Sequence, residues 1–421
     1  MEKDKIKSYI AILEKELLPA MGCTEPIALA YSVAYAKKLL GKTPERVVVK
    51  CSGNIIKNTM AVTVPSTNGL RGIKAAALAG VYGGNADKQL EVLTDVTDED
   101  RKMINEKLKT DMVQVEALDS THALHIIAEV YAGEEYATVE VIDTHTNLGH
   151  VEKNGEVLHE KKEEELVELL DDEKSLTLKE IIEFADNVNL DDVREMLERQ
   201  IEYNSNISKE GLTNDWGASV GKTLMTYGDD IYTKIKASAA AGSDARMSGC
   251  LLPVVINCGS GNQGITVTMP IVTYGEYIGA SHEEILRALC MANLTAVHQK
   301  SGIGRLSAFC GALCAATASV AGIAYMNKDE YDVIAQTIVN SLGNVGGMVC
   351  DGAKSSCAAK IASSLDCALM GYEMAKRKRG FIDGEGIVKA NVEKTIESVG
   401  RMASQGMRVT DQEILRIMLD Q

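Results

Sequence analysis

The sequence has few aromatic residues, few prolines and a deficit of positive charge. Aromatic side chains make up 4% of the 421 residues, and only 6 residues are proline. The 60 Asp and Glu residues outnumber the 44 Lys and Arg residues, which gives a formal charge of −16. Nucleic acids and anionic membranes bind basic surfaces. The composition therefore argues against both, and we expect no nucleic acid and no membrane as partners.

Secretory targeting and disulfide bonding are not indicated either. The chain opens with the charged stretch MEKDKIKSYI, which lacks the apolar region of a signal peptide. We therefore predict a cytoplasmic protein, in which thiols stay reduced. The 10 cysteines are too few for a disulfide scaffold in a chain of this length. Their candidate roles are core packing, metal or cluster binding, and nucleophilic chemistry.

The pattern of apolar residues predicts an α+β fold, in which the first domain, residues 1–165, is mixed α/β and carries the GCTEP motif. Helices are expected over 3–18, 27–40 and 70–78, and strands over 46–52, 61–64, 113–117, 124–131 and 136–143. A hairpin over 150–159 is predicted to turn at Asn154-Gly155 in the type I′ conformation. Thr24 is the expected N-cap of the second helix.

The second domain, residues 166–421, is predicted to be largely all-helical. The charge-rich stretch 160–174 before it is interpreted as a solvated linker or helix start. Ser281 to Glu284 form a capping box, which marks the start of a helix. Residues 306–326 carry no charged side chain and are long enough to span a bilayer, but they are rich in Ala, Gly, Ser and Thr. We interpret them as a buried central helix.

Eight of the ten cysteines lie after residue 249, and their surroundings differ. Cys290 and Cys314 have contexts typical of core residues. Cys310, Cys350 and Cys357 lie beside glycine-dense stretches, where the backbone can wrap closely around a bound group. Three thiolates could hold an iron–sulfur cube and leave one iron free, but the spacing matches neither a ferredoxin run nor a zinc pair. The residues alone leave core packing and cluster binding open.

Cys23 stands apart from this group. It lies in the break MGCTEP, residues 21–26, between two predicted helices. The start of a helix carries partial positive charge, which favours a thiolate there. A reactive thiolate and a buried loop thiol are the two interpretations of this residue.

Three separated motifs together resemble the L-cysteine desulfidase family, which is serine-dehydratase-like and iron–sulfur dependent. They are MGCTEP over 21–26, GSGNQG over 259–264 and MVCDGAKSSC over 348–357. The C-terminal part also resembles, more distantly, the α domain of iron–sulfur L-serine dehydratases. The interval from Cys350 to Cys357 is shorter than in those dehydratases, which indicates a different loop at the cluster.

The resemblance implies a 4Fe-4S cluster held by Cys310, Cys350 and Cys357. It implies a lyase that converts L-cysteine to pyruvate, ammonia and sulfide by β-elimination. The substrate heteroatom would bind at the open iron of the cluster, which acts as a Lewis acid and accepts soft sulfur readily.

The resemblance also implies that Cys23 is the base. A thiolate there would remove the Cα proton of the amino acid, which β-elimination requires. The substrate carboxylate needs amide or hydroxyl donors. Thr24 and the glycine-rich turn that contains Asn262 and Gln263 are the candidates for binding it.

Several alternatives stay open. Cys23 could be a cluster ligand, with Cys357 as a structural thiol and the base unnamed. The enzyme could be an L-serine dehydratase, or a pyridoxal-phosphate lyase that uses Lys354 as a Schiff base. Outside enzymes, the chain could be an iron–sulfur sensor or a zinc-stabilised binding protein. A homodimer is the expected oligomeric state of a soluble enzyme.

Overall fold

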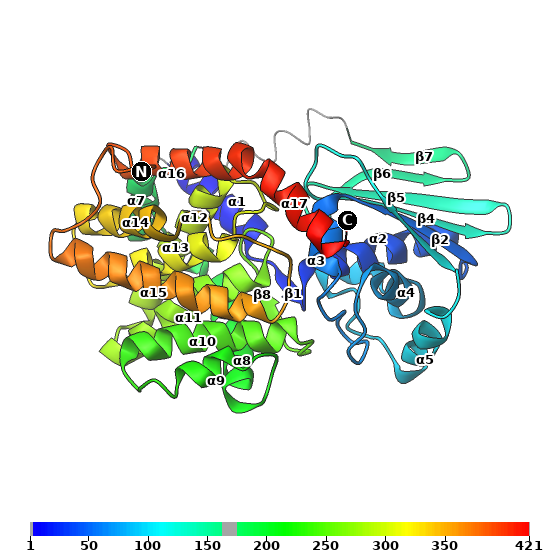
Figure 1. Cartoon of the computed structure of the whole chain (residues 1–421), viewed down its shortest axis with the longest axis horizontal. Helices are drawn as coiled ribbons and strands as arrows, with labels where there is room; N and C mark the ends of the chain where they lie inside the picture. The colour runs from blue at the N-terminus through cyan, green and yellow to red at the C-terminus, as the bar shows by residue number, and fades with distance from the viewer. Residues whose placement is uncertain (1–2, 162–174, 421) are drawn as a thin grey trace.

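The structure, a computed structural model, describes residues 3–161 and 175–420. Two parts lie side by side, a mixed part around one sheet and a larger part built from helices (Figure 1). The predicted α+β class is confirmed, with a mixed N-terminal region followed by a largely helical C-terminal region. The domain boundary at residue 165 and most of the charge-rich stretch 160–174 around it lie outside the described residues, so the boundary stays a prediction.

The mixed part is a six-stranded sheet with helices on one side (Figure 1). Its strands are β2 (Arg46–Cys51), β3 (Val113–Ala117), β4 (His125–Ala132), β5 (Glu135–Ile142), β6 (Leu148–Lys153) and β7 (Glu156–Glu160), in the order β3-β2-β4-β5-β6-β7. Its helices are α2 (Thr24–Leu40), α3 (Gly53–Thr59), α4 (Ile73–Gly83), η1 (Ala86–Glu91) and α5 (Asp98–Lys107). Strands β2 and β3 run parallel, and the other neighbours run antiparallel. Along β4, Ile126, Ala128 and Val130 are fully buried at alternate positions, where α2 packs against β4 and β5.

The predicted hairpin is confirmed, and two other local predictions are wrong. Asn154 and Gly155 have φ of 51° and 86°, as a type I′ turn requires. The stretch 61–64 forms no strand and makes only one isolated bridge, from Thr63. Val62 and Val64 are fully buried without forming a strand, so the spacing of apolar residues reflected burial in a loop. The N-cap of α2 is Cys23 and not Thr24, because the helix already begins at Thr24.

The helical part surrounds one buried helix. Its helices are α1 (Lys3–Glu16), α7 (Leu178–Asn187), η2 (Leu190–Asp192), α8 (Arg194–Thr213), α9 (Val220–Leu224), α10 (Ile231–Met247), α11 (Gly261–Ile278), α12 (His282–Ser301), α13 (Gly311–Met326), α14 (Tyr331–Val345), α15 (Ser356–Lys376), α16 (Val392–Arg401), η3 (Met402–Gly406) and α17 (Arg408–Met418). α13 contacts α11, α12, α14 and α15, and nearly all of its side chains are buried. This confirms the buried central helix, which starts later than the predicted 306–326. Across the described ranges, no helix is both long and apolar enough to cross a membrane.

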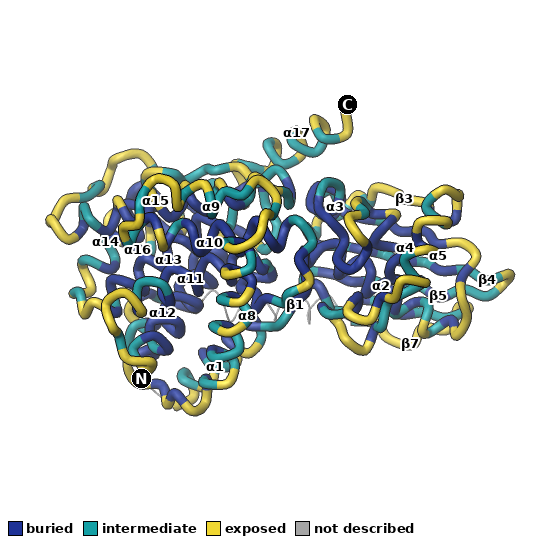
Figure 2. The backbone as a smooth tube through the Cα atoms, turned by 90° about the horizontal axis from the view of Figure 1, so that it is seen from below, coloured by how far each residue is buried: buried dark blue, intermediate teal, exposed yellow. Residues whose placement is uncertain are grey.

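Segments near both ends of the chain connect the two parts. The short strand β1 (Pro19–Met21) pairs antiparallel with β8 (Pro253–Val255), which brings the MGCTEP segment to the chain that precedes GSGNQG. Helix α1 packs against α12, so the first helix of the chain lies in the helical part (Figure 1). Helix α17 reaches from the helical part to α3 and runs along the surface, outside the buried interiors of both parts (Figure 2). The two motifs therefore meet at the seam between the parts.

Candidate functional site

A cavity of about 100 Å³ at this seam, called the inner cavity below, gathers side chains from distant points of the sequence. The mixed part contributes Cys23, Glu25 and Asn58, and the helical part contributes residues that include Arg246, Asn262, Gln263, Lys300, Arg305, Cys310, Cys350 and Cys357. Every predicted site residue is therefore in the lining, except Thr24 and the alternative Schiff-base residue Lys354. Their chemical roles stay predictions, because proximity alone does not assign them.

Four helices begin at the inner cavity, and none of these four has a side-chain cap at its described start. Cys23, Ser260 and Cys310 occupy the N-cap positions of α2, α11 and α13, and Cys357 lies in the first turn of α15. Capping side chains usually satisfy the first N–H groups of a helix. Here the partial positive charge of four helix starts faces one cavity, together with three cationic side chains of the lining. The inner cavity therefore favours an anion, although the chain as a whole is acidic.

Backbone pairing places two of the predicted cluster ligands next to each other. An isolated antiparallel bridge joins Phe309 to Val349. Across it, the N–H of Cys310 donates to the Met348 carbonyl at 2.8 Å, and the N–H of Cys350 donates to the Ala308 carbonyl at 2.6 Å. These bonds fix the two thiol-bearing loops side by side at the start of α13.

The third thiol, Cys357, is close enough to interact electrostatically with Cys310 and Cys350. Desolvation, followed by the effect of Cys350, raises the pKa of Cys310 to about 12. Desolvation likewise raises the pKa of Cys357. Without a bound cation these two thiols are therefore neutral, and metal binding would release their protons. In the parts of the chain that the structure describes, no three His, Cys, Asp or Glu side chains are arranged to hold a single metal ion.

Cys23 is a buried thiol that donates a hydrogen bond to a carboxylate. Its Sγ lies 3.0 Å from Glu25 Oε2, and the Asn58 amide donates to Glu25 Oε1 at 3.2 Å. Burial, followed by the Glu25 carboxylate, raises the pKa of Cys23 well above its ordinary value of 9.0, while Arg246 opposes the shift. Of the two interpretations of Cys23, the buried thiol describes the resting protein, because desolvation and a nearby negative charge outweigh the helix dipole. Sγ and Oε2 are placed to exchange one proton.

The predicted donors for the substrate carboxylate divide into two groups. The Thr24 hydroxyl donates to the Gly259 carbonyl at 2.9 Å, so it ties the two motifs together and does not line the cavity. Asn262 and Gln263 do line it, from the first turn of α11. Among the described residues, Asn262 Oδ1 and Gln263 Oε1 have no hydrogen-bond partner. These two side chains are free to contact a ligand.

Sequence reasoning missed the charged and imidazole groups around the inner cavity. Arg246, only 2% exposed, lies near the end of α10. With Asp244 it interrupts an alanine-rich stretch, and two charges in such a stretch are the signal that could have revealed it. Arg305 forms a buried ion pair with Glu16 of α1. His145 reaches the seam from the loop after β5, and burial lowers its pKa to about 4, so its ring is neutral at pH 7.

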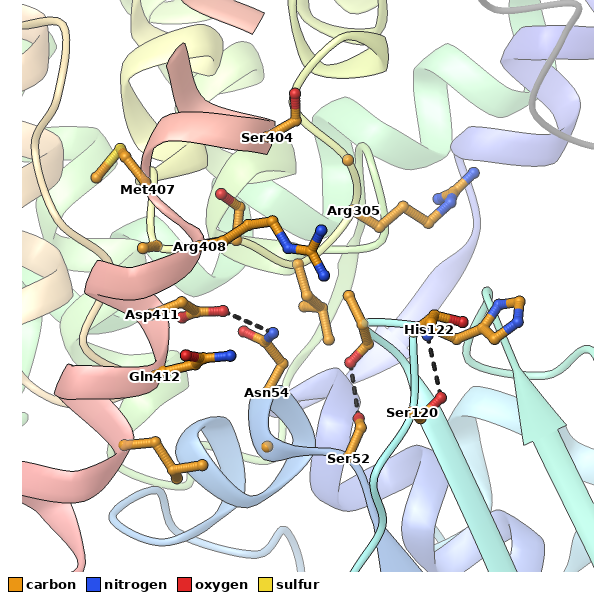
Figure 3. A pocket seen from close by; sticks show the side chains of 18 of the residues that line it. Ser52, Asn54, Ser120, His122, Arg305, Ser404, Met407, Arg408, Asp411 and Gln412 are labelled. Atoms are coloured by element: carbon orange, nitrogen blue, oxygen red, sulfur yellow. Dashed lines mark hydrogen bonds between the residues drawn. The ribbon is translucent and has the colours of Figure 1, made fainter. Parts of the chain in front are cut away.

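A larger cavity of about 570 Å³, called the outer cavity, shares the segment 305–307 with the inner cavity. Figure 3 shows Arg408 and Asp411 of α17 facing Asn54 and the loop after β3 across it. Asn54 donates to Asp411 at 2.8 Å, and the buried Lys57 forms an ion pair with the same carboxylate at 2.5 Å. The outer cavity is thus walled on one side by the C-terminal helix, and it adjoins the inner cavity at segment 305–307.

Comparison with known proteins identifies a family and several full-length relatives that this chain resembles. The model of the serine dehydratase alpha chain family matches residues 87–416, which include the three clustered cysteines and Arg246 but not Cys23. The UPF0597 protein of Lachnoclostridium phytofermentans is 50% identical over 98% of this chain and 100% of its own length. UPF0597 proteins of Desulfitobacterium hafniense and Treponema denticola are 47% and 46% identical, over 99% and 100% of this chain and 97% and 99% of their own lengths.

Proposed function

We propose that this chain, which belongs to the serine dehydratase alpha chain family, is an iron–sulfur dependent L-cysteine desulfidase. The family supports an amino-acid lyase that acts by β-elimination. The proposed reaction consumes L-cysteine and water and yields pyruvate, ammonia and sulfide. The observation that carries the proposal is the meeting of three neighbouring thiols and a separate thiol–carboxylate pair at one anion-favouring cavity.

The donor set fits an iron–sulfur cluster. Cys310, Cys350 and Cys357 would hold it, because thiolates are the ligands that such clusters prefer. The thiols come from two loops and a helix start that backbone hydrogen bonds hold together, and the helix dipoles compensate negative charge. When bound, the cluster would supply a Lewis-acidic iron for the sulfur of the substrate.

The remaining steps belong to side chains of this protein. Glu25 Oε2 accepts the proton of Cys23 Sγ along the existing hydrogen bond. The Cys23 thiolate then takes the Cα proton, while Arg246 and the start of α2 offset its negative charge. The amide of Asn58 holds Glu25 in position. The proton thus leaves Cα on the side of the cavity where Cys23 and Glu25 lie.

An L-serine dehydratase is the second candidate, and the family description is the observation that favours it. The same Cys23 and Glu25 would remove the Cα proton of L-serine, and water would leave in place of sulfide. The two candidates therefore differ in the leaving group and not in the proton-handling residues.

Anaerobic reconstitution with iron and sulfide tests the proposal. We expect about four irons per chain, sulfide release from L-cysteine, and a lower kcat/KM for L-serine. A higher kcat/KM for L-serine would establish the dehydratase instead. Turnover that survives complete removal of iron by a chelator would contradict both candidates.

A further inference from the structure

Arg246 carries a buried positive charge whose hydrogen-bonding edge is empty. The residue is 2% exposed, and among the described residues its Nε and Nη2 atoms have no hydrogen-bond partner. Guanidinium keeps its charge at any physiological pH. The Glu25 carboxylate interacts electrostatically with Arg246, but it makes no hydrogen bond to these two donors. Buried donors without hydrogen-bond partners are costly, so the site is built for an anion that the protein chain does not supply.

The two empty donors form one edge of the guanidinium group. Nε and Nη2 lie side by side, and their N–H bonds point in the same direction. This edge binds the two oxygens of a carboxylate at once, which a thiolate, with a single acceptor atom, cannot do. The Nε–Nη2 edge of Arg246 is therefore better suited to a carboxylate than to the neighbouring thiols Cys23 and Cys357.

A glycine keeps the space beside this edge open. A Cβ atom at Gly261 would lie 2.3 Å from Arg246 Nε, so any side chain there would displace the guanidinium group. Gly261 is the first residue of α11, and the N-cap Ser260 makes no side-chain cap. The first N–H groups of α11 are therefore available beside the Nε–Nη2 edge, and they add donors and a positive dipole end.

We propose that the Nε–Nη2 edge of Arg246 and the first turn of α11 bind the α-carboxylate of the amino-acid substrate. The identity of the carboxylate as that of an amino acid rests on the proposed function, whereas the carboxylate site itself rests on Arg246 and Gly261. Bound in this way, the carboxylate orients the substrate so that Cα faces the Cys23 side of the inner cavity. Amino-acid derivatives in which the carboxylate is an amide are then poor ligands.

Two small thiol ligands that lack the amino group of the substrate test the site by binding alone. 3-Mercaptopropionate and its amide differ only in the carboxylate, and neither carries the amino group of the substrate. Isothermal titration of the anaerobic holoprotein should show much tighter binding of the acid than of the amide. In Arg246→Gln the affinity for the acid should fall on the order of 100-fold, with the affinity for the amide unchanged. Arg246→Lys should retain only part of the affinity for the acid, because Lys lacks the two parallel N–H donors of the guanidinium group.

Two further variants separate a binding role from a structural one. Gly261→Ala keeps the charge and fills the space beside Nε, so it should also weaken binding of the acid and not of the amide. Arg377→Gln, which removes an exposed charge elsewhere, should change neither affinity. Iron content and unfolding temperature are measured in all variants.

The outcomes distinguish this inference from the proposed function. Preference for the acid that persists in both Arg246→Gln and Gly261→Ala would overturn the carboxylate site. So would loss of iron in Arg246→Gln with the preference for the acid intact, because Arg246 would then serve the thiolates. If the wild-type protein releases no sulfide from L-cysteine but its preference for the acid depends on Arg246, the desulfidase proposal fails and the carboxylate site stands.

Discussion

The two sides of the inner cavity each hold a buried charge, and the two charges are partnered differently. On the mixed side, the Glu25 carboxylate accepts hydrogen bonds from Cys23 and Asn58. On the helical side, two N–H groups of Arg246 have no partner among the described residues. A buried polar group persists without a partner where a ligand supplies one. The mixed side is thus organised in advance to handle a proton, whereas the helical side is organised to receive ligands.

Removing one of the three clustered thiols on the helical side should have the largest effect on activity. Alanine substitution of Cys310, Cys350 or Cys357 should remove the bound iron and lower sulfide release at least about 1000-fold, because the Lewis acid is lost. Iron analysis and steady-state kinetics measure both. Cys290→Ala, in the core of α12, is the matched control: it should keep iron and activity and cost about 1–2 kcal/mol of stability. Full iron content in all three alanine variants would show that these cysteines do not bind the cluster.

Removing the thiol on the mixed side should separate iron binding from turnover. Cys23→Ala should keep the iron of the wild-type protein and lose about 10²–10⁴-fold in kcat, because the base is missing. Iron analysis and rapid kinetics on the same anaerobic sample test this. Loss of iron in Cys23→Ala would instead support the alternative in which Cys23 is a cluster ligand, and the contrast between the two sides would disappear.

The Glu25 carboxylate should control both the rate and the titration of Cys23. Its negative charge raises the pKa of Cys23, so Glu25→Gln should lower that pKa toward 9.0, although burial still keeps it elevated. The same change removes the proton acceptor and should reduce kcat about 10–100-fold. The thiolate absorbance near 240 nm, measured against pH with Cys23→Ala as the background, gives the pKa. An unchanged or higher pKa of Cys23 in Glu25→Gln would contradict the coupling between the two side chains. Glu25→Asp keeps a carboxylate and should therefore retain part of the effect on the pKa of Cys23.

Weakening the attachment of α17, the helix that contacts both parts of the molecule, should have the smallest effect on turnover. Asp411→Asn leaves Lys57, which is 1% exposed, without its counter-charge and should weaken the docking of α17 by about 3 kcal/mol. Hydrogen exchange of the α17 amides should then accelerate, with kcat changed only a few-fold. Glu413→Gln removes a surface ion pair with Arg416 on the same helix and should change exchange very little. Equal protection of α17 in both variants would show that the Lys57 pair does not hold it.

Much of the secondary structure could be predicted because local patterns carry it. The Asn154-Gly155 turn and the Ser281 capping box depend on neighbouring residues only, and both are confirmed. The stretch 61–64 misled the prediction because buried loop residues can have the composition of a strand. Thr24 misled it because several residues could start α2, and tertiary contact with Gly259 engages the threonine hydroxyl.

The site was only partly predictable. Local context and motifs indicated Cys23, Cys310, Cys350, Cys357, Asn262 and Gln263, and the structure places all of them at one cavity. Neither the motifs nor the resemblance indicated Arg246, which interacts electrostatically with Cys23 and Glu25, residues that lie more than 200 positions earlier in the sequence. The helix dipole alone could not decide between a thiolate and a neutral thiol at Cys23, because the pKa of a thiol depends on burial and on the Glu25 carboxylate as well.

The sequence by itself determined the α+β class, the order of a mixed part before a helical part, and which thiols are candidates for chemistry. These follow from periodicity, turn residues and motifs, all of which act over short stretches. Only the tertiary structure decided that four uncapped helix starts meet at one seam, that Cys23 is a neutral thiol bonded to Glu25, and that Arg246 is buried with an empty edge. Burial and electrostatic coupling arise from residues that are distant in sequence, and for that reason only the folded chain fixes them.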